Sequence, residues 1–374
     1  MKLVTRTGVV MTAAVLSLSL AACTASNEAP AENESATPGT SETAAAVELA
    51  GSINGAGASS QESAMEAWRA GFQSLNPDVT VNYDPVGSGG GRTQFLDGAT
   101  SFAGSDAQMD EEEYALAMTR CDGDSGAIHL PMYISPIAVI FNLEGVDSLN
   151  MDADTIANIF NGTITTWNDE AIAAQNEGVT LPDTAITIVH RADESGTTEN
   201  FTEYLAAAST TWGEEPSGDW VGAAGESGQG TSALVQIVQD NVGTIGYADA
   251  SRAGELGTVA LKVGEEYVPF SAEAAAAVVD ASPAAEGTNG ENDLAIHLDR
   301  TTTAAGAYPL VLVSYSIACQ SYEDETERAL VTGFLKYIAS AEGQAKSASA
   351  AGSSPISADL SAKITSILDE IAAA

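Results

Sequence analysis

The residues with the most evident chemistry lie in one short segment, residues 191–197, which reads Arg-Ala-Asp-Glu-Ser-Gly-Thr. An apolar β-type run over residues 184–190 leads into this segment, and a helical pattern over residues 199–208 follows it. A strand-to-helix turn of this kind offers an arginine, two hydroxyls and the free N–H groups of a helix N-terminus, which together suit an anion. The alternative is an ordinary capped helix whose arginine pairs with Asp193 on the surface.

Two earlier segments repeat the order of strand, hydroxyl-containing turn and helix. One turn contains Ser59 and Ser60, and the other contains Ser88. Such a turn directs N–H groups and a hydroxyl outward at the positive end of a helix, so we expect the three turns to converge on one small oxyanion. The alternative is three independent N-caps, each contributing about 1 kcal/mol. Ser59 and Glu62 also have the spacing of a capping box.

Asp106 follows Gly104 and Ser105 at the end of a predicted strand, where a binding cleft would open. A carboxylate repels a bound anion unless that anion has a proton to donate. Monohydrogen phosphate has one, whereas sulfate at neutral pH has none. Asp106 would therefore accept a hydrogen bond from phosphate and reject sulfate. An aspartate in an ordinary turn is the alternative.

Other kinds of site lack the residues that they need. Gly55 and Gly57 are not followed by the third glycine of the dinucleotide fingerprint, and the glycine-rich turn at residues 225–231 lacks the lysine of a P-loop. The His-Glu-x-x-His motif does not occur, the three histidines are expected to be structural, and Ser195 lies outside a nucleophile elbow. We therefore expect neither a catalytic residue nor a metal or cofactor.

Composition and the N-terminus indicate where the protein works. The 374 residues include 13 Lys+Arg against 52 Asp+Glu, which disfavours binding to nucleic acid or to anionic lipid headgroups. Lys2 and Arg6 precede an apolar run over residues 9–20, which is too short to span a membrane, and Leu-Ala-Ala-Cys follows at residues 20–23. This pattern resembles a bacterial lipobox, which implies cleavage before Cys23 and lipidation of its thiol. A plain secretory signal is the alternative.

Strand-type and helical segments alternate along the rest of the chain, which predicts an α/β fold with a mixed or mostly parallel sheet. The length favours two packed cores. Two long apolar β-type runs, residues 128–142 and 308–318, are expected to connect the two lobes, the first being broken at Pro131 and Pro136. Residues 253–300 carry few structural signals.

Cys121 and Cys319 are the cysteines that remain after Cys23. In an exported protein two remaining cysteines are expected to pair, and two buried free thiols are the alternative.

An ordered set of motifs extends over residues 50–374, and as a set it is far more specific than any one motif. It resembles the phosphate-binding proteins of the high-affinity phosphate (Pst) ABC transporter, and the contexts of the cysteines resemble those of actinobacterial members. In chain order the motifs are Gly55-Ala-Gly57-Ala-Ser59, Val86-Gly-Ser88-Gly-Gly90, Gly104-Ser105-Asp106, Thr166-Trp167-Asn-Asp-Glu-Ala-Ile172, residues 191–197, and Ile245-Gly-Tyr247.

The resemblance implies a two-lobed, class II periplasmic-binding-protein fold, or Venus flytrap, with two crossover strands at the hinge. A signal peptide (1–22) and a flexible tether (23–48) would precede lobe I (49–132), lobe II (133–308) and the return to lobe I (309–374). It also implies a non-enzymatic monomer without a cofactor, held on the outer face of the cell membrane by lipid alone. This receptor would bind inorganic phosphate and deliver it to the permease subunits of the transporter. A receptor for sulfate or molybdate, and a secreted phosphate-ester hydrolase, are the rival interpretations.

The resemblance also assigns roles to first-lobe residues. Ser59 would donate its hydroxyl, Ser60 its backbone N–H, and Ser88 both kinds of donor. Asp106 would accept the proton of phosphate. Ser60 stands where the family commonly has Phe, which would change the packing of the cleft but leave a main-chain contact intact.

In the second lobe, the resemblance makes Arg191 the charged group of the site, held in place by Asp193. Glu194 departs from the family, which commonly has Gly there, and it adds a negative charge beside Arg191. That charge would either lower the affinity or be neutralised by a salt bridge. The donors that complete the cage would be Ser195, Gly196 and Thr197.

Overall fold

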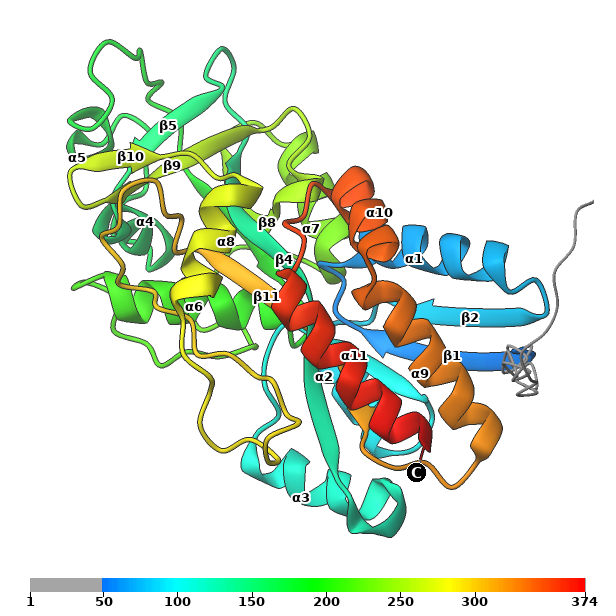
Figure 1. The fold of residues 1–374 in the computed structure, drawn as a ribbon. Helices are drawn as coiled ribbons and strands as arrows, with labels where there is room; N and C mark the ends of the chain where they lie inside the picture. The colour runs from blue at the N-terminus through cyan, green and yellow to red at the C-terminus, as the bar shows by residue number, and fades with distance from the viewer. Residues whose placement is uncertain (1–48, 374) are drawn as a thin grey trace, which may run out of the picture. The chain divides into compact units, whose positions relative to one another are not determined.

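The computed structural model describes residues 49–373, in which helices alternate with strands, as the α/β prediction requires (Figure 1). The predicted signal peptide, Cys23 and the tether lie outside the described residues. The strands are β1 (Gly51–Gly57), β2 (Val79–Asp84), β3 (Phe102–Ser105), β4 (Ala127–Phe141), β5 (Ser148–Met151), β6 (Thr187–Arg191), β7 (Glu226–Gly228), β8 (Thr244–Asp249), β9 (Gly257–Val263), β10 (Glu266–Val268) and β11 (Val311–Cys319). The helices are α1 (Glu62–Leu75), α2 (Ser88–Leu96), α3 (Glu111–Arg120), α4 (Ala153–Phe160), α5 (Glu170–Ala173), α6 (Gly196–Ala208), α7 (Gly230–Asp240), α8 (Ala272–Ala281), α9 (Glu325–Ala339), α10 (Ala341–Ala351) and α11 (Ala358–Ala373).

The strands form a mixed sheet in the order β2-β1-β3-β11-β4-β8-β6-β7, and β9 joins it through β4 and carries β5 and β10. β1 is parallel to β2 and β3, and β6 is parallel to β7 and β8. β4 and β11 are antiparallel and lie between these two sets (Figure 1). We call β1–β3 the first strand group and β5–β10 the second strand group. β11 pairs with β3 and β4 pairs with β8, so these two central strands join the groups.

The prediction that prolines break the first long apolar run was wrong, because β4 is continuous from Ala127 to Phe141. The register of β4 and β11 shifts where Ser314 faces Tyr133 and Tyr315 faces Pro131, which leaves Met132 as the extra residue of a bulge. A bulge locally interrupts the hydrogen-bond ladder, so a proline that lacks an N–H is tolerated beside it.

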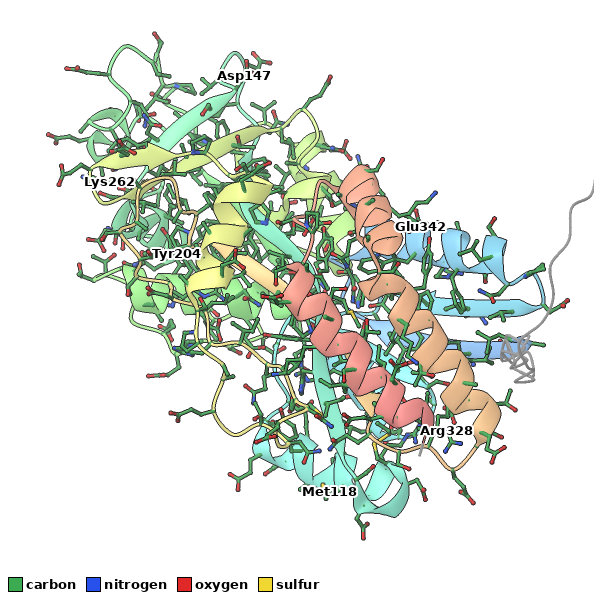
Figure 2. All side chains as sticks on the ribbon, viewed as in Figure 1. Met118, Asp147, Tyr204, Lys262, Arg328 and Glu342 are labelled. Atoms are coloured by element: carbon green, nitrogen blue, oxygen red, sulfur yellow. A yellow bond between two sulfur atoms is a disulfide. The ribbon has the colours of Figure 1, made fainter. Side chains whose placement is uncertain are left out.

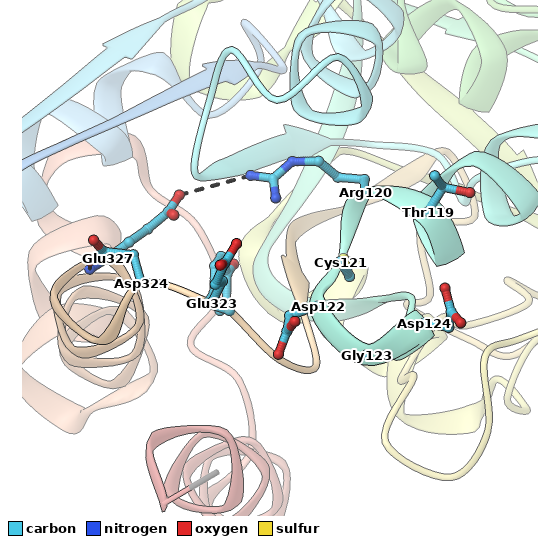
Figure 3. Close-up of a pocket in the computed structure, with 10 residues that line it drawn as sticks. Thr119, Arg120, Cys121, Asp122, Gly123, Asp124, Glu323, Asp324 and Glu327 are labelled. Carbon is cyan, nitrogen blue, oxygen red and sulfur yellow. Dashed lines mark hydrogen bonds and ion pairs between the residues drawn. The ribbon is translucent and has the colours of Figure 1, made fainter.

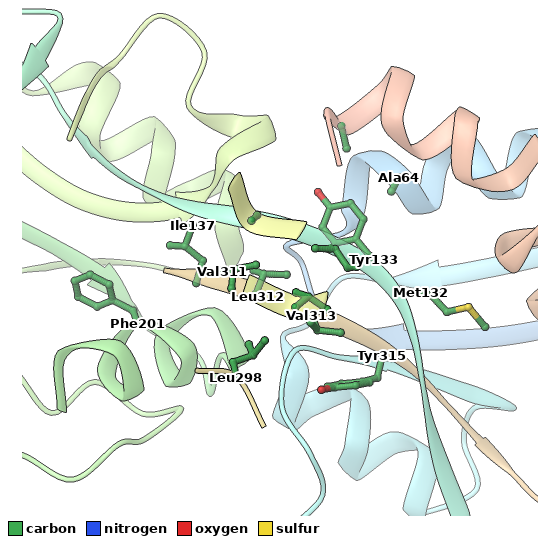
Figure 4. Packing of buried hydrophobic residues seen from close by; sticks show 14 of the residues in the cluster. Ala64, Met132, Tyr133, Ile137, Phe201, Leu298, Val311, Leu312, Val313 and Tyr315 are labelled. Carbon is green, nitrogen blue, oxygen red and sulfur yellow. The ribbon is translucent and has the colours of Figure 1, made fainter. Parts of the chain in front are cut away.

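Both central strands are buried along their whole lengths. Their side chains, among them Tyr133, Ile137, Val311 and Val313, pack together in the centre of the core (Figure 4). A strand covered on both faces is mostly apolar along its length, and this explains why the two runs stood out in the sequence. Side chains of the helices also enter the core, and the buried Tyr204 of α6 is an example (Figure 2).

One region contains more structure than its sequence pattern indicates. The segment 253–300 contains β9, β10 and α8, all of them short, so each gives only a weak periodic signal. Near the C-terminal end, α9 and α10 are separate helices. Ser340 takes an extended conformation and its side chain accepts a hydrogen bond from Gly343 N, which ends α9 and begins α10.

The pairing of Cys121 with Cys319 is confirmed, with the two Cα atoms 5.3 Å apart. Cys121 follows α3 and Cys319 ends β11, so the disulfide fastens α3 to the centre of the sheet.

A surface hollow of about 860 Å³ lies beside this bridge (Figure 3). Arg120 in its wall pairs with Glu327 at 3.8 Å. The remaining charged side chains of the wall are acidic, so the hollow would repel an anion. They are Asp122, Asp124, Glu323 and Asp324. None of the helices between residues 49 and 373 combines the length and the apolar character that a bilayer crossing needs.

Replacing both bridging cysteines, Cys121→Ser with Cys319→Ser, should lower the free energy of unfolding by about 4 kcal/mol. The bridge closes a loop across a separation of 198 residues, and the chain-entropy model gives a stabilisation of this size for so long a loop. Urea unfolding followed by far-UV circular dichroism measures the change. A reductant should destabilise the unmodified protein equally and leave the double variant unaffected. An unchanged unfolding midpoint would contradict a stabilising bridge.

Candidate functional site

Asp106, just beyond β3 and 4% exposed, lies at the centre of the predicted residues. Ser60 Oγ donates to its Oδ1 at 2.7 Å, and Thr197 Oγ1 donates to its Oδ2 at 3.0 Å. Its backbone N–H donates to Ser88 Oγ at 3.1 Å. Four residues that are far apart in the sequence therefore meet around one buried carboxylate.

Ser59 does not cap α1, so the capping-box prediction was wrong. The N-cap position is Gln61, which makes no side-chain capping bond, and Glu62 pairs with Arg252 instead. Ser59 Oγ lies 3.0 Å from Thr231 Oγ1 and accepts a hydrogen bond from Thr231 N at 3.1 Å. The hydroxyl therefore connects the start of α1 to the start of α7. Thr231 lies in the glycine-rich turn noted in the sequence, but its spacing gave no sign of this contact.

Of the three hydroxyl turns, the one at Ser195 caps its own helix. Ser195 Oγ accepts from Thr198 N at 3.2 Å, whereas α2 begins after Gly87 without a side-chain cap. The interpretation as three independent caps is therefore wrong. The next residue, Gly196, brings α6 close to the first strand group. A Cβ at this position would lie 2.6 Å from Ser88 Oγ and 2.7 Å from Asp106 Cβ, so a side chain would force the two apart.

Arg191 ends β6 and is 3% exposed, which contradicts the alternative of a surface arginine. It forms a two-point ion pair with Asp193, in which Nε lies 2.8 Å from Oδ1 and Nη2 contacts Oδ2. Asp193 Oδ1 also accepts from Gly230 N at 2.9 Å. The arginine is therefore fixed by a carboxylate that is itself attached to the start of α7.

Glu194 pairs with Arg92 of α2, a residue that the sequence analysis missed. Arg92 Nη2 lies 2.6 Å from Glu194 Oε1, and Arg92 Nε donates to both carboxylate oxygens of Glu113, at 2.8 and 2.9 Å. Arg92 Nη1 donates to Ser105 Oγ at 3.1 Å, beside Asp106. Of the two outcomes expected for the extra charge of Glu194, the structure shows the salt bridge.

Asn200 is a further contact that the sequence did not reveal. Its Nδ2 donates to the backbone oxygens of Asp106 and Gly196, both at 2.8 Å, and its Oδ1 accepts from Arg300. Arg300 also donates to Val311 O in β11. The position of Asn200, four residues after Gly196 on α6, places it on the same helix face as the predicted turn, but its partners depend on the tertiary fold.

Comparisons with known proteins identify the family of this chain. A family model described as "PBP superfamily domain" matches residues 33–342. The chain is 36% identical to the phosphate-binding protein PstS 3 of Mycobacterium tuberculosis over 288 residues, covering 75% of this chain and 76% of that protein. It is 35% identical to PstS2 of Mycobacterium bovis over 326 residues, covering 84% and 86%. The chain belongs to the PstS family of phosphate-binding proteins.

Solved structures confirm a periplasmic-binding-protein-like fold for this PstS chain. A phosphate-binding protein called PfluDING gives a TM-score of 0.67 at 22% identity, covering 84% of this chain and 93% of that one. The phosphate-binding protein of Stenotrophomonas maltophilia gives a TM-score of 0.63 at 18% identity, covering the same shares of the two chains. The predicted family is confirmed, whereas the roles of individual site residues stay predictions.

Different parts of the surroundings of Asp106 in this PstS chain shift its pKa in opposite directions. Burial raises the pKa of Asp106, and neighbouring hydroxyls and Arg191 oppose the rise. Ser314 of β11 is one of these hydroxyl groups, and its buried Oγ has no hydrogen-bond partner of good geometry among the described residues. Burial, aided by the charge of Asp106, also raises the pKa of Tyr83, so the phenol stays neutral.

His129 and His190 make contacts that hold the fold together. His129 is fully buried, accepts from Met109 N at 3.1 Å, and contacts Asp293 Oδ1 through Nδ1 at 3.1 Å, so it has the structural role predicted for it. His190 stacks on Trp220 at a centroid distance of 5.1 Å. Within residues 49–373, no three His, Cys, Asp or Glu side chains are grouped so as to hold a metal ion.

Replacing Arg92 by Met should weaken anion binding about tenfold, because Glu194 would then lie uncompensated near Arg191. Glu194→Gln alone should change the affinity less than about threefold, because its side chain is 45% exposed and a pair of this kind is partly screened. The double variant should recover part of the loss. Isothermal titration of the four proteins with phosphate measures the coupling.

The same cycle at high salt provides the control, since screening should reduce the coupling between the two residues. Strictly additive effects at low salt would show that Arg92 does not neutralise Glu194.

Proposed function

We propose that this chain is a receptor that binds inorganic phosphate outside the cytoplasm and delivers it to the permease subunits of an ABC importer. The observation that carries the proposal is Asp106, a buried carboxylate at the meeting point of donors that otherwise suit an anion. The PstS relatives, at 32–37% identity, are named phosphate-binding proteins, and so are several proteins of the same fold. These names support the same ligand.

The geometry provides a separate role for each kind of group. Arg191 supplies the positive charge, and the starts of α2 and α6 supply backbone N–H groups. Ser88 Oγ accepts from Asp106 N and therefore keeps its own O–H proton for the ligand. Each oxygen of Asp106 accepts one hydroxyl and retains a second acceptor site. A proton on phosphate would occupy that site, whereas sulfate would leave two negative charges in contact.

The fold also supports closure of two lobes by a hinge. The first strand group would belong to lobe I and the second to lobe II, with β4 and β11 as the crossover strands between them. The contacts from Ser59 to Thr231 and from Asp106 to Thr197 join these groups, so they would form on closure and break on opening. The lobe boundaries at residues 132 and 308 are part of this proposal.

The rival functions have less support. A sulfate or molybdate receptor would have no use for an unprotonated carboxylate at its centre. A phosphate-ester hydrolase would need an activated nucleophile, but Ser195 Oγ is a helix cap, and Ser59 Oγ contacts Thr231 rather than a histidine. We therefore infer that the protein is not an enzyme and requires no cofactor, and we propose that it acts as a monomer.

The protein should bind phosphate at least about a hundredfold more tightly than sulfate, because sulfate would bring an unpaired charge clash of about 2.7 kcal/mol or more. Asp106→Asn should reduce this preference to about tenfold or less, since an amide can donate a hydrogen bond to sulfate. Calorimetric titration of both proteins with both anions gives the two ratios.

Asp280→Asn provides the matched control, because it removes the same charge from an exposed position on α8. It should leave the preference unchanged. Equal affinities for phosphate and sulfate in the unmodified protein would refute the proposed function. An unchanged preference in Asp106→Asn would refute only the role assigned to Asp106.

We also propose that lipid on Cys23 holds the receptor at the outer face of the cell membrane. The support is the lipobox-like sequence Leu-Ala-Ala-Cys after the apolar run. Cys23→Ala should move the protein from the membrane fraction to the soluble fraction and abolish incorporation of labelled palmitate, while Thr24→Ala should change neither. A Cys23→Ala protein that stays in the membrane fraction would contradict a lipid anchor.

A further inference from the structure

Ser60 touches the centre of the site with its side chain, whereas the family resemblance implies a backbone contact alone. The residue is 1% exposed, and its Oγ donates to Asp106 Oδ1 at 2.7 Å. A hydrogen bond from a hydroxyl to a carboxylate is charge-assisted, and it favours the ionised form of the acceptor. Ser60 therefore acts directly on the group that is proposed to select the ligand.

Ser60 and Thr197 both donate to this carboxylate, but they belong to different parts of the sheet. It lies in the turn between β1 and α1, and β1 pairs directly with β3, the strand that leads to Asp106. Thr197 lies on α6, which follows β6 of the second strand group. A hinge opening would remove Thr197 but leave Ser60 in contact with Asp106, so Ser60 sets the state of the carboxylate before the ligand arrives.

The other groups around Asp106 shift its pKa in opposite directions. Burial raises the pKa of Asp106, while the hydroxyls of Ser314, Ser60 and Thr197 and the charge of Arg191 lower it. Tyr83 of β2 faces it as a neutral phenol. A cavity of about 690 Å³ borders Asp106 on another side and has acidic walls. The acidic residues of the cavity are Asp110, Glu111, Glu199, Glu203 and Glu286, and His297 is its histidine.

We propose that Ser60 is a specificity-determining residue, whose hydroxyl keeps Asp106 a hydrogen-bond acceptor so that the site still rejects sulfate in mildly acidic surroundings. This inference rests on the proposed phosphate-binding function. A protonated Asp106 would donate a hydrogen bond, and sulfate would then fit as well as phosphate. Phosphate has a proton to donate in both of its forms near neutral pH, so its binding depends less on the state of Asp106.

The test is the ratio of phosphate to sulfate affinity, measured by calorimetry between about pH 5 and pH 8. For Ser60→Ala, the ratio at each pH is compared with the variant's own ratio at pH 8, so that any change in absolute affinity does not enter the comparison. As the pH falls, Asp106 in the variant should protonate first, because the lost hydrogen bond had lowered its pKa. The pH at which the ratio falls should therefore be about one unit higher in Ser60→Ala than in the unmodified protein. A shift of this size corresponds to about a tenfold change in the proton affinity of Asp106. Ser60→Thr should restore the original profile.

Two controls separate this effect from others. Ser347→Ala removes an equally buried, hydrogen-bonded hydroxyl whose partner is Ser353, and it should not shift the profile. Glu199 titrates between pH 5 and pH 8, because burial raises its pKa to about 7 against the opposing charge of Arg92. The shift caused by Ser60→Ala should therefore persist when Glu199→Gln is also present.

Coincident profiles for the unmodified protein and Ser60→Ala would overturn the inference while leaving phosphate binding intact. Failure of the unmodified protein to bind phosphate at pH 8 would overturn the proposed function itself. Ser60→Gly removes the same hydroxyl, and it serves as the second variant if Ser60→Ala does not fold. A profile of Ser60→Gly that matches the unmodified protein would likewise overturn the inference.

Discussion

The burial of one carboxylate, Asp106, is the constraint around which the site is built. An ionised carboxylate without partners is costly inside a protein, so it must be surrounded by donors. The structure supplies hydroxyl donors from Ser60 before α1 and Thr197 on α6, and Arg191 at the end of β6 adds a positive charge nearby. These same elements must meet if an anion is to be enclosed. The need to satisfy Asp106 and the need to bind an anion therefore select the same arrangement.

The strongly acidic composition does not conflict with an anion site, because the decisive charges near the site are paired locally. Asp193 forms an ion pair with Arg191, and Glu194 shares Arg92 with Glu113, so each of these acidic side chains has an arginine partner. The many other acidic residues act through water and salt, which screen their field beyond about 8–10 Å. Helix N-termini and N–H groups act at contact distance, where screening is weak. Local geometry therefore outweighs net charge in this site.

Much of the fold was predictable because its signals are local. The long buried strands β4 and β11 appeared in the sequence as apolar runs. The family was also predicted correctly. The errors came where a local rule competed with a distant partner. Ser59 has the spacing of a capping residue, but its hydroxyl contacts Thr231, which is 172 positions away.

The sequence by itself determined the fold class, the family, the disulfide partners and the types of residue in the site, since each depends on residue identity, order or compartment. The tertiary structure decided which of those residues touch. The partners of Glu194 and Asn200, and the side-chain contact of Ser60, depend on how α2, α6 and the turn before α1 approach one another. Distances between such elements are set by packing of the whole core, and no local pattern encodes them. The residue types of the turn at residues 191–197 thus give it the chemistry to bind an anion. Its specificity depends on Asp106, which the fold places beside it.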